Sequence, residues 1–226
     1  MAMQDSVSDI ALADADSGSS AERRSSDTAR RERTRRRILD VAFHLIGHEK
    51  GRSVRIEEIC AEAKISRGSF YNYFAGIEPL FEALADDLTH RFTLAVLAEM
   101  NRMPSAAEQA DVAMRYYLSR ARSDPQWGWA MVNIGATGPL FGAETFASAL
   151  HTVADGIAAG EFILKDATVG RDLVLGACHA ALISHLRDGS PDDQPRLVSR
   201  SVLRGLGVPP DRIETILLRN LPPLNS

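Results

Sequence analysis

The hydrophobic positions of this chain recur with the period of an α-helix along most of its length. Between residues 29 and 46 the apolar residues fall at i, i+3, i+4, i+7 and i+8: Ile38, Val41, Ala42, Leu45 and Ile46. This spacing places them on one face of an amphipathic helix. The alternation of apolar and polar residues that marks a strand persists nowhere in the sequence. The pattern predicts an all-α protein.

The same period continues after Gly76 and predicts a series of helices up to the end of the chain. The first of these carries Leu80, Leu84 and Leu88 at helical spacing, with Pro79 near its start, where proline is tolerated. Further helices are predicted at 105–122, 125–135, 144–159, 168–188, 194–205 and 209–220. Glycine and proline clusters separate them.

Two short helices and a tight turn are predicted between these regions. Residues 56–63 form the first helix, with its apolar residues, including Cys60, turned inward. Ser66 is a good N-cap for the second, which we expect to run from Arg67 to about Phe74. Two short helices joined by a short turn are typical of a helix-turn-helix, whose second helix enters the major groove of DNA.

The second short helix combines an apolar face with side chains suited to DNA. Phe70 and Phe74 are four residues apart and share the inward face. The other side chains then project mostly into solvent: Arg67, Ser69, Tyr71, Asn72 and Tyr73. Arginine can read guanine and asparagine can read adenine, while hydroxyl groups commonly bind phosphate. Gly68 lets the backbone approach DNA closely.

The net charge of −4 conceals a basic segment. Residues 22–75 carry 13 Lys and Arg against 8 Asp and Glu, whereas the rest of the chain is acidic. The arginines of residues 30–37 lie at the end of a helix where the helix dipole disfavours cations. A basic segment in an acidic protein favours a local contact with a polyanion, such as a phosphate-binding arm. A solvated charged face and a nuclear localisation signal are the alternatives.

The N-terminal 28 residues are rich in Ser, Asp and Ala and show no sustained apolar period, so we predict that they are disordered. They contain no apolar core of a secretory signal, and no credible membrane span follows. Cys60 and Cys178 give neither a disulfide framework nor zinc spacing, which fits a reducing cytoplasm. We predict neither a metal site nor a cofactor.

Candidate residues for a ligand pocket cluster in the middle of the chain. These are Trp127, Trp129, Met131, Phe141, Phe146 and His151. They could line an apolar pocket, although plain core or a subunit interface is the alternative for each of them. Residues 173–186 are apolar on nearly all sides and carry a stripe of small residues. With 194–205 they could form a two-fold interface, or be buried within one subunit.

The stretch "IEEICAEAKISRGSFYNYFAGIEPLFEAL" resembles the DNA-binding domain of the TetR family of transcriptional regulators, over about Arg33 to Leu84. "DGIAAGEF", residues 155–162, resembles a stretch of the family's ligand-binding domain more weakly. The resemblance implies a disordered tail at 1–28, a three-helix DNA-binding domain at 29–76 and a helical ligand-binding and dimerisation domain at 77–226. It implies a cytoplasmic homodimer that represses transcription from a palindromic operator and responds to a small-molecule effector.

By position in the family pattern and by charge, we expect these residues to contact DNA: Arg33, Arg36, Arg55, Ser66, Arg67, Gly68, Ser69, Tyr71, Asn72 and Tyr73. The chain departs from the family at three positions. Lys64 replaces the usual glycine of the turn, where a left-handed conformation would be strained. Arg55 replaces the threonine cap, and Ile77 replaces a phosphate-binding lysine. The arginine arm could compensate for the lost phosphate contact.

The leading function is therefore a ligand-responsive, dimeric repressor. An enzyme is the rival from another class, but the chain contains no G-x-S-x-G, H-E-x-x-H, P-loop or G-x-G-x-x-G motif. We therefore predict that it is not an enzyme. A nucleoid or architectural DNA-binding protein without a ligand is the other alternative, because it would share the same DNA-binding domain.

Overall fold

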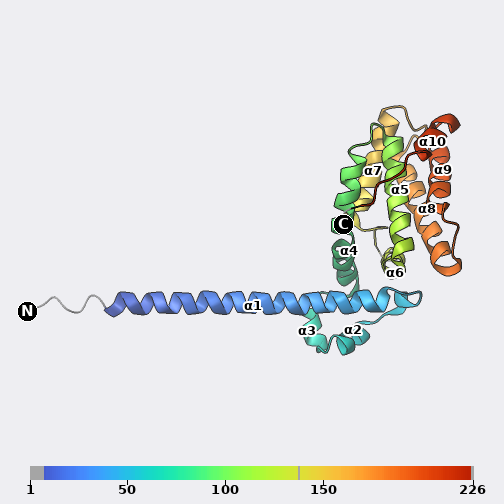
Figure 1. The fold of residues 1–226 in the computed structure, drawn as a ribbon. Coiled ribbons are helices and arrows are strands. Elements are labelled where there is room, and N and C mark those ends of the chain that lie inside the picture. The colour runs from blue at the N-terminus through green and yellow to red at the C-terminus, as the bar shows by residue number, and fades with distance from the viewer. Residues whose placement is uncertain (1–7, 137, 225–226) are drawn as a thin grey trace, which may run out of the picture.

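The structure is a computed structural model that describes residues 8–136 and 138–224, with side chains from Ser25 onward. Ten α-helices and one short 3-10 helix form this part of the chain, which contains no strand. The prediction of an all-α fold is confirmed. Three helices form a small head at one end of the molecule, seven follow, and the two regions meet where α4 (Ile77–Met100) rises from the head (Figure 1).

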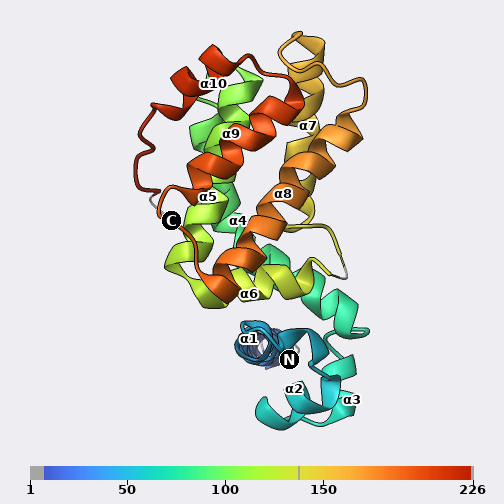
Figure 2. The same cartoon turned by 90° about the vertical axis from the view of Figure 1, so that its right-hand side faces the viewer.

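The head consists of α1 (Ser8–Ile46), α2 (Ile56–Glu62) and α3 (Arg67–Tyr71), with η1 (Gly51–Ser53) between α1 and α2. One apolar core joins these elements, because Ile38 of α1, Ile59 of α2 and Phe70 of α3 are all fully buried. The start of α4 closes this core with Leu80 and Leu84. In Figures 1 and 2, α2 and α3 lie on the side of α1 that faces away from the rest of the molecule.

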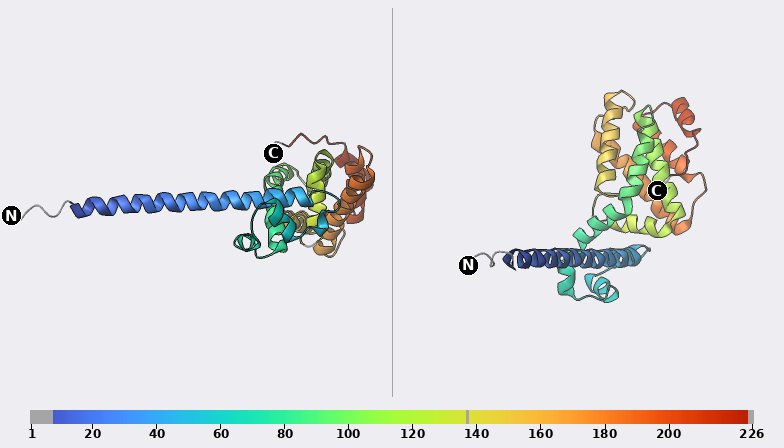
Figure 3. Two further views of the ribbon diagram at one scale, coloured as in Figure 1. Left: turned by 90° about the horizontal axis from the view of Figure 1, so that it is seen from below. Right: turned by 60° about the vertical axis from the view of Figure 1, so that its left-hand side comes forward.

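Helix α1 begins earlier than the sequence suggested. The structure continues it back to Ser8, so residues 8–28 are helical rather than disordered; residues 1–7 lie outside the described part of the chain. Residues 8–28 contain four alanines, the strongest helix formers, and no proline. The helix therefore continues without interruption into the part of α1 that lies in the head. It extends past the head without another element beside it (Figure 3).

The remaining helices form the body. They are α5 (Ala106–Ser123), α6 (Pro125–Ile134), α7 (Ala143–Ala158), α8 (Ala167–Asp188), α9 (Gln194–Leu206) and α10 (Pro210–Leu217). Helix α5 is central and contacts α4 and each of α6 to α10. Figure 2 shows α8 and α9 side by side on the near face of the body. None of the helices in the described residues combines the length and hydrophobicity that a membrane span requires.

In the body, capping residues explain why the starts of α5, α6 and α8 agree closely with the predicted ones. The side chains of Ser105, Asp124 and Asp166 each accept a hydrogen bond from the first turn of α5, α6 and α8. Such caps satisfy backbone N–H groups that have no partner within the helix. Pro125 follows directly as the first residue of α6, where its missing N–H costs nothing.

Candidate nucleic-acid interface and effector cavity

The short helix α3 is held by one cap and two aromatic anchors. The Ser66 hydroxyl accepts a hydrogen bond from the backbone N–H of Ser69 at 3.1 Å, as expected for an N-cap. Phe70 and Phe74 are buried, which confirms their predicted inward direction. The helix ends at Tyr71 rather than at about Phe74, but the Phe74 N–H still donates to the Phe70 carbonyl. These contacts fix the orientation of the outer face of α3.

The outer face of α3 carries the predicted DNA-contacting residues. Arg67, Gly68, Tyr71 and Asn72 are exposed, whereas Ser69 and Tyr73 are half-buried. The Arg67 guanidinium lies 3.0 Å from the Glu57 carboxylate of α2. An exposed pair of this kind contributes little to stability, so Arg67 can exchange Glu57 for another acceptor at small cost.

Two of the three departures from the family pattern lie in the turn before α3 and at the start of α2. Lys64 has a φ of 54°, in the left-handed region that favours glycine, as the sequence suggested. The cost of this conformation for a residue with a Cβ is roughly 1–2 kcal/mol. At the start of α2, the backbone N–H of Arg55 donates to the Glu58 carboxylate at 2.8 Å, so Glu58 supplies its half of a capping box, whereas a guanidinium cannot accept from the first-turn N–H groups. The Arg55 side chain remains exposed.

The arginines of α1 divide between two environments. Arg36 pairs with Asp40 at 3.0 Å and with Asp87 of α4 at 2.8 Å, so it ties α1 to α4. Arg35 stacks over the Phe74 ring, 5.5 Å from its centre. On another side of the helix, Arg33 lies on one exposed stripe of α1 with Arg30 and Arg37. Arg30, Arg33 and Arg37 therefore form a basic surface, whereas Arg36 also makes a structural contact between α1 and α4.

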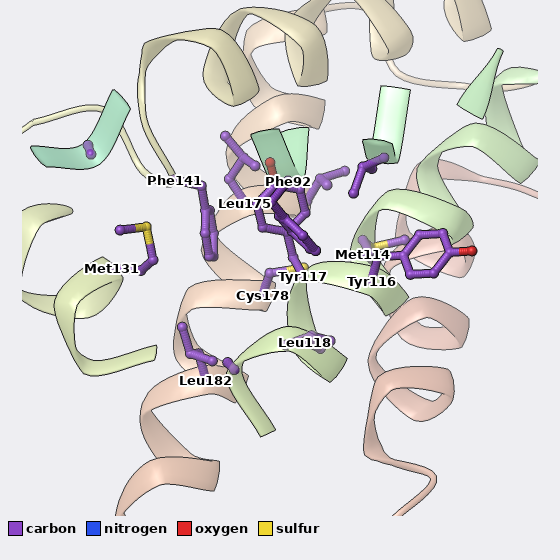
Figure 4. Close-up of a cluster of buried hydrophobic side chains, with 14 of the residues drawn as sticks. Phe92, Met114, Tyr116, Tyr117, Leu118, Met131, Phe141, Leu175, Cys178 and Leu182 are labelled. Carbon is purple, nitrogen blue, oxygen red and sulfur yellow. The ribbon is translucent and has the colours of Figure 1, made fainter. Parts of the chain in front are cut away.

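The body encloses a cavity between four helices. Its volume is about 50 Å³, and it is lined by residues of α4, α5, α7 and α8 and by Phe141. Most lining side chains are apolar, among them Val96, Met114 and Leu175. Figure 4 shows Phe141, Leu175 and Cys178 gathered near Tyr117, whereas Tyr116 points away from them. An apolar lining with a few polar groups is typical of small-molecule sites.

Three hydroxyl groups meet at the wall of this cavity. The Tyr117 hydroxyl of α5 lies 2.6 Å from the Thr145 hydroxyl of α7 and 2.8 Å from the Thr93 hydroxyl of α4. The two threonine hydroxyls are 3.3 Å apart. We call these three residues the hydroxyl triad. It joins three helices through one buried network of hydrogen bonds.

The cavity wall is uncharged at neutral pH. Seventeen residues line it, and none is Asp, Glu, Lys, Arg or His. Burial raises the pKa of the Cys178 thiol to about 12, so this side chain stays protonated. Burial also raises the pKa of Tyr117, against the smaller lowering effect of its hydrogen bonds to Thr145 and Thr93. The site therefore presents hydroxyls and a thiol, but no ion.

The six residues expected at a ligand pocket lie in different environments. Phe141 lines the cavity, and its ring is 5.4 Å from that of Tyr117. Trp127 and Met131 are buried in the core of α6, and Trp129 is half-buried on the same helix. Phe146 packs beneath Arg171, and His151 is exposed beside Asp155. The hydroxyl triad was not among the predicted residues.

Helix α6 connects the cavity region with the head. The buried side-chain amide of Asn133 donates to the backbone carbonyls of Ile46 and His48, at 2.7 and 2.9 Å. These carbonyls lie at the end of α1, where the helix leaves acceptors unpaired. Gly47 faces the first turn of α6 so closely that a Cβ there would lie 2.4 Å from Gln126. Helix α6 also contacts α4, because the Trp127 indole donates a hydrogen bond to the Leu88 carbonyl at 3.3 Å.

Family models match both parts of the chain. One described as "Bacterial regulatory proteins, tetR family" matches residues 38–84, which contain most of the head. One described as "Tetracyclin repressor-like, C-terminal domain" matches residues 105–219, which contain the body. The second match alone covers half of the chain.

Solved structures with the same fold include that of RolR in complex with resorcinol. It is 27% identical, with a TM-score of 0.69, and the match covers 88% of this chain and 100% of that chain. RolR without ligand is 25% identical in its match, with a TM-score of 0.66, covering 83% and 98%. The fatty acid degradation regulator FadR from Bacillus halodurans, 17% identical with a TM-score of 0.57 over 78% and 97% of the two chains, shares the fold.

A curated relative matches over a shorter segment. The nucleoid occlusion factor SlmA of Pasteurella multocida (strain Pm70) is 31% identical over 93 residues, which are 40% of this chain and 46% of that protein. The match therefore spans about half the length of that relative.

Proposed function

This chain belongs to the TetR family of bacterial regulatory proteins, and on that premise we propose that it represses transcription as a homodimer that releases a palindromic operator when a small molecule binds the cavity of the body. As a member of this family it is a DNA-binding transcriptional regulator. The observation that carries the proposal is the junction at Asn133, which hydrogen-bonds α6 to the end of α1 in the head, while α6 packs against α5 and α8 of the cavity wall. The helix that links the cavity wall to the head is thus α6.

We assign DNA recognition to the outer face of α3. Arg67 and Asn72 are exposed and have side chains that can read guanine and adenine. Tyr71 and Tyr73, together with the hydroxyls of Ser66 and Ser69, suit phosphate contacts that fix the register on DNA. Arg30, Arg33 and Arg37 of α1 and the exposed Arg55 add positive charge that attracts the phosphate backbone. Arg36 reaches DNA only by giving up its contact with Asp87.

We assign dimerisation to α8 and α9. The inner face of α8 is buried at Val174, Cys178 and Leu182, while Leu173 and Ala180 are exposed on another face. A Cβ added at Gly176 would meet no atom within 4 Å, so this part of α8 has an open surface of small residues. Exposed apolar surface on an otherwise buried helix favours a partner. A two-fold dimer would match two operator half-sites with the same symmetry.

An effector site in the cavity has a second support in the RolR complex. That protein holds resorcinol, and its identity of 27% to this chain extends over 88% of the residues. Its example favours a small-molecule effector for this chain as well. The cavity at the hydroxyl triad is the site in which we place it.

The test begins with the operator. The purified chain is incubated with genomic fragments at about 150 mM salt with excess competitor DNA, and the bound fragments are sequenced. Enrichment of one palindrome close to a promoter is the expected result. Repression is then measured with a reporter gene behind that sequence, and its relief with candidate effectors added to the cells.

A ligand-independent nucleoid protein is the second candidate, because the curated relative that matches over 93 residues is named a nucleoid occlusion factor. It predicts binding to many sites that no promoter adjoins. It also predicts that occupancy of the cavity leaves DNA affinity unchanged. The fragment selection and the effector titration therefore separate the two candidates.

A further inference from the structure

We propose that the effector is a small uncharged molecule, of the class of phenols without an ionised group, whose hydroxyl donates a hydrogen bond to the triad of Thr93, Tyr117 and Thr145. This inference rests on the proposed effector site and names the chemistry that the site selects. Three features of the cavity support it: its lining, the hydrogen-bond capacity of the triad and the position of the aromatic rings.

The absence of charge around the cavity excludes ionic effectors. A carboxylate or ammonium group that enters an apolar site loses its hydration and needs an opposite charge to offset the loss. No such charge is present among the lining residues, and the two ionisable groups in the wall, Tyr117 and Cys178, are held protonated by burial. An organic acid would therefore bind far more weakly than its neutral isostere.

The triad has acceptors to spare but few donors. Each of its three hydroxyls has one hydrogen, and the three contacts between them, at 2.6, 2.8 and 3.3 Å, can use all three hydrogens. Each oxygen still has lone-pair capacity after one acceptance. A ligand that donates a hydrogen bond adds to this network without breaking it. A ligand that can only accept must first displace one of the existing contacts.

The aromatic side chains beside the triad favour a planar ring. Phe92 and Phe141 both meet the Tyr117 ring edge-to-face, at 4.9 and 5.4 Å between ring centres. Phe141 also lines the cavity, so a ring in this space can pack against it. An apolar cavity of about 150 Å³ already accommodates benzene. The cavity here, at about 50 Å³, is smaller than that, so it suits one small ring at most and must widen around the ring on binding.

Four probes test separately the selection for a hydrogen-bond donor and the selection against charge. 4-Methylphenol and 4-methylanisole differ in the hydrogen that can be donated, while 4-hydroxybenzamide and 4-hydroxybenzoate have nearly the same shape and differ in charge. Affinities for the full chain are measured by titration calorimetry without DNA. We expect 4-methylphenol to bind about fivefold to tenfold more tightly than 4-methylanisole. We expect the benzoate to bind at least about a hundredfold more weakly than the benzamide.

Two variants test whether the preference for 4-methylphenol over 4-methylanisole depends on the triad. The triple substitution Thr93→Val, Tyr117→Phe and Thr145→Val replaces the whole hydrogen-bond network with apolar groups of similar shape, which leaves no hydroxyl of the triad unpaired. Thr152→Val is the matched control, since Thr152 is also buried, also lines the cavity and lies on α7 two turns from Thr145. We expect the preference for 4-methylphenol to vanish in the triple variant and to persist in Thr152→Val. Thermal unfolding of both variants checks that they fold.

Each adverse result has a distinct meaning. Equal binding of 4-methylphenol and 4-methylanisole, or a preference that survives in the triple variant, overturns the role of the triad. Tight binding of 4-hydroxybenzoate overturns the selection against charge. Failure of all four probes to bind the folded protein overturns the proposed ligand class. Because the assay contains no DNA, probes that bind as expected but leave operator affinity unchanged contradict only the proposed repressor function.

Discussion

At the scale of single residues, the surface that we propose faces DNA is defined by the contrast between buried phenylalanines and exposed polar groups on α3. Asn72 follows the last residue of α3 and is exposed, with no part in the core. If it reads one base, Asn72→Ala should weaken operator binding by about 1–3 kcal/mol and relax the preference at one position in each half-site. Fragment selection repeated with the variant measures this change.

A suitable control for Asn72 is Asn101→Ala, an exposed asparagine at the far end of α4. It should leave both affinity and sequence preference unchanged. A loss of affinity in Asn72→Ala that is equal for all DNA sequences would assign Asn72 to the phosphate backbone instead of a base.

Lys64 offers a second test at this scale because its backbone is strained. Its φ of 54° suits glycine, and relief of roughly 1–2 kcal/mol is opposed by the larger entropy of glycine in the unfolded chain. Lys64→Gly should therefore stabilise the protein by up to about 1 kcal/mol, as measured by urea denaturation. Lys64→Ala is the control, since it removes the charge but retains the strain. A Lys64→Gly variant less stable than Lys64→Ala would show that the strain is relaxed in solution, because only the entropy cost of glycine would then remain.

At the scale of elements, most helices could be predicted from the sequence and the cavity could not. Helix ends depend on residues close in sequence, such as Ser105 and Asp124, whose caps the chain displays directly. Thr93, Tyr117 and Thr145 come from three helices, and their meeting depends on how those helices pack. Trp127 was expected at the pocket but is buried in the core. The sequence does not separate these two cases, because large apolar side chains form the same pattern in a core and in a pocket.

The contact between α6 and α1 gives a prediction at the scale of elements. The Asn133 amide donates two hydrogen bonds to backbone carbonyls at the end of α1. Removal of the amide takes this donor away from both carbonyls. Asn133→Ala should destabilise the protein by about 1–3 kcal/mol. It should also reduce the effect of a bound effector on operator affinity, while the effector still binds the cavity. Operator titrations with and without effector, alongside calorimetry of effector binding, measure these two quantities.

Arg196→Ala provides the comparison for Asn133. It removes a hydrogen bond to Asn220 at the C-terminal end of the body, far from the head in sequence and in contact with neither α1 nor α6. Its effector response should match that of the unmodified chain. An unchanged response in Asn133→Ala as well would mean that the coupling between cavity and head does not depend on the Asn133 hydrogen bonds.

At the scale of the whole molecule, the proposed function depends on two copies of the chain presenting two α3 helices to one operator. The open surface at Gly176 on α8 allows this to be tested without disturbing the subunit. Gly176→Gln should leave the fold intact, since glycine is a poor helix former and a Cβ at this position meets no atom within 4 Å. It should prevent close approach of a partner, so that sedimentation velocity detects monomers and operator affinity falls by at least about a hundredfold. Ser119→Gln, at an exposed position on α5, should retain the dimer. Gly176→Gln protein that is dimeric and binds the operator normally would move the interface away from this face of α8.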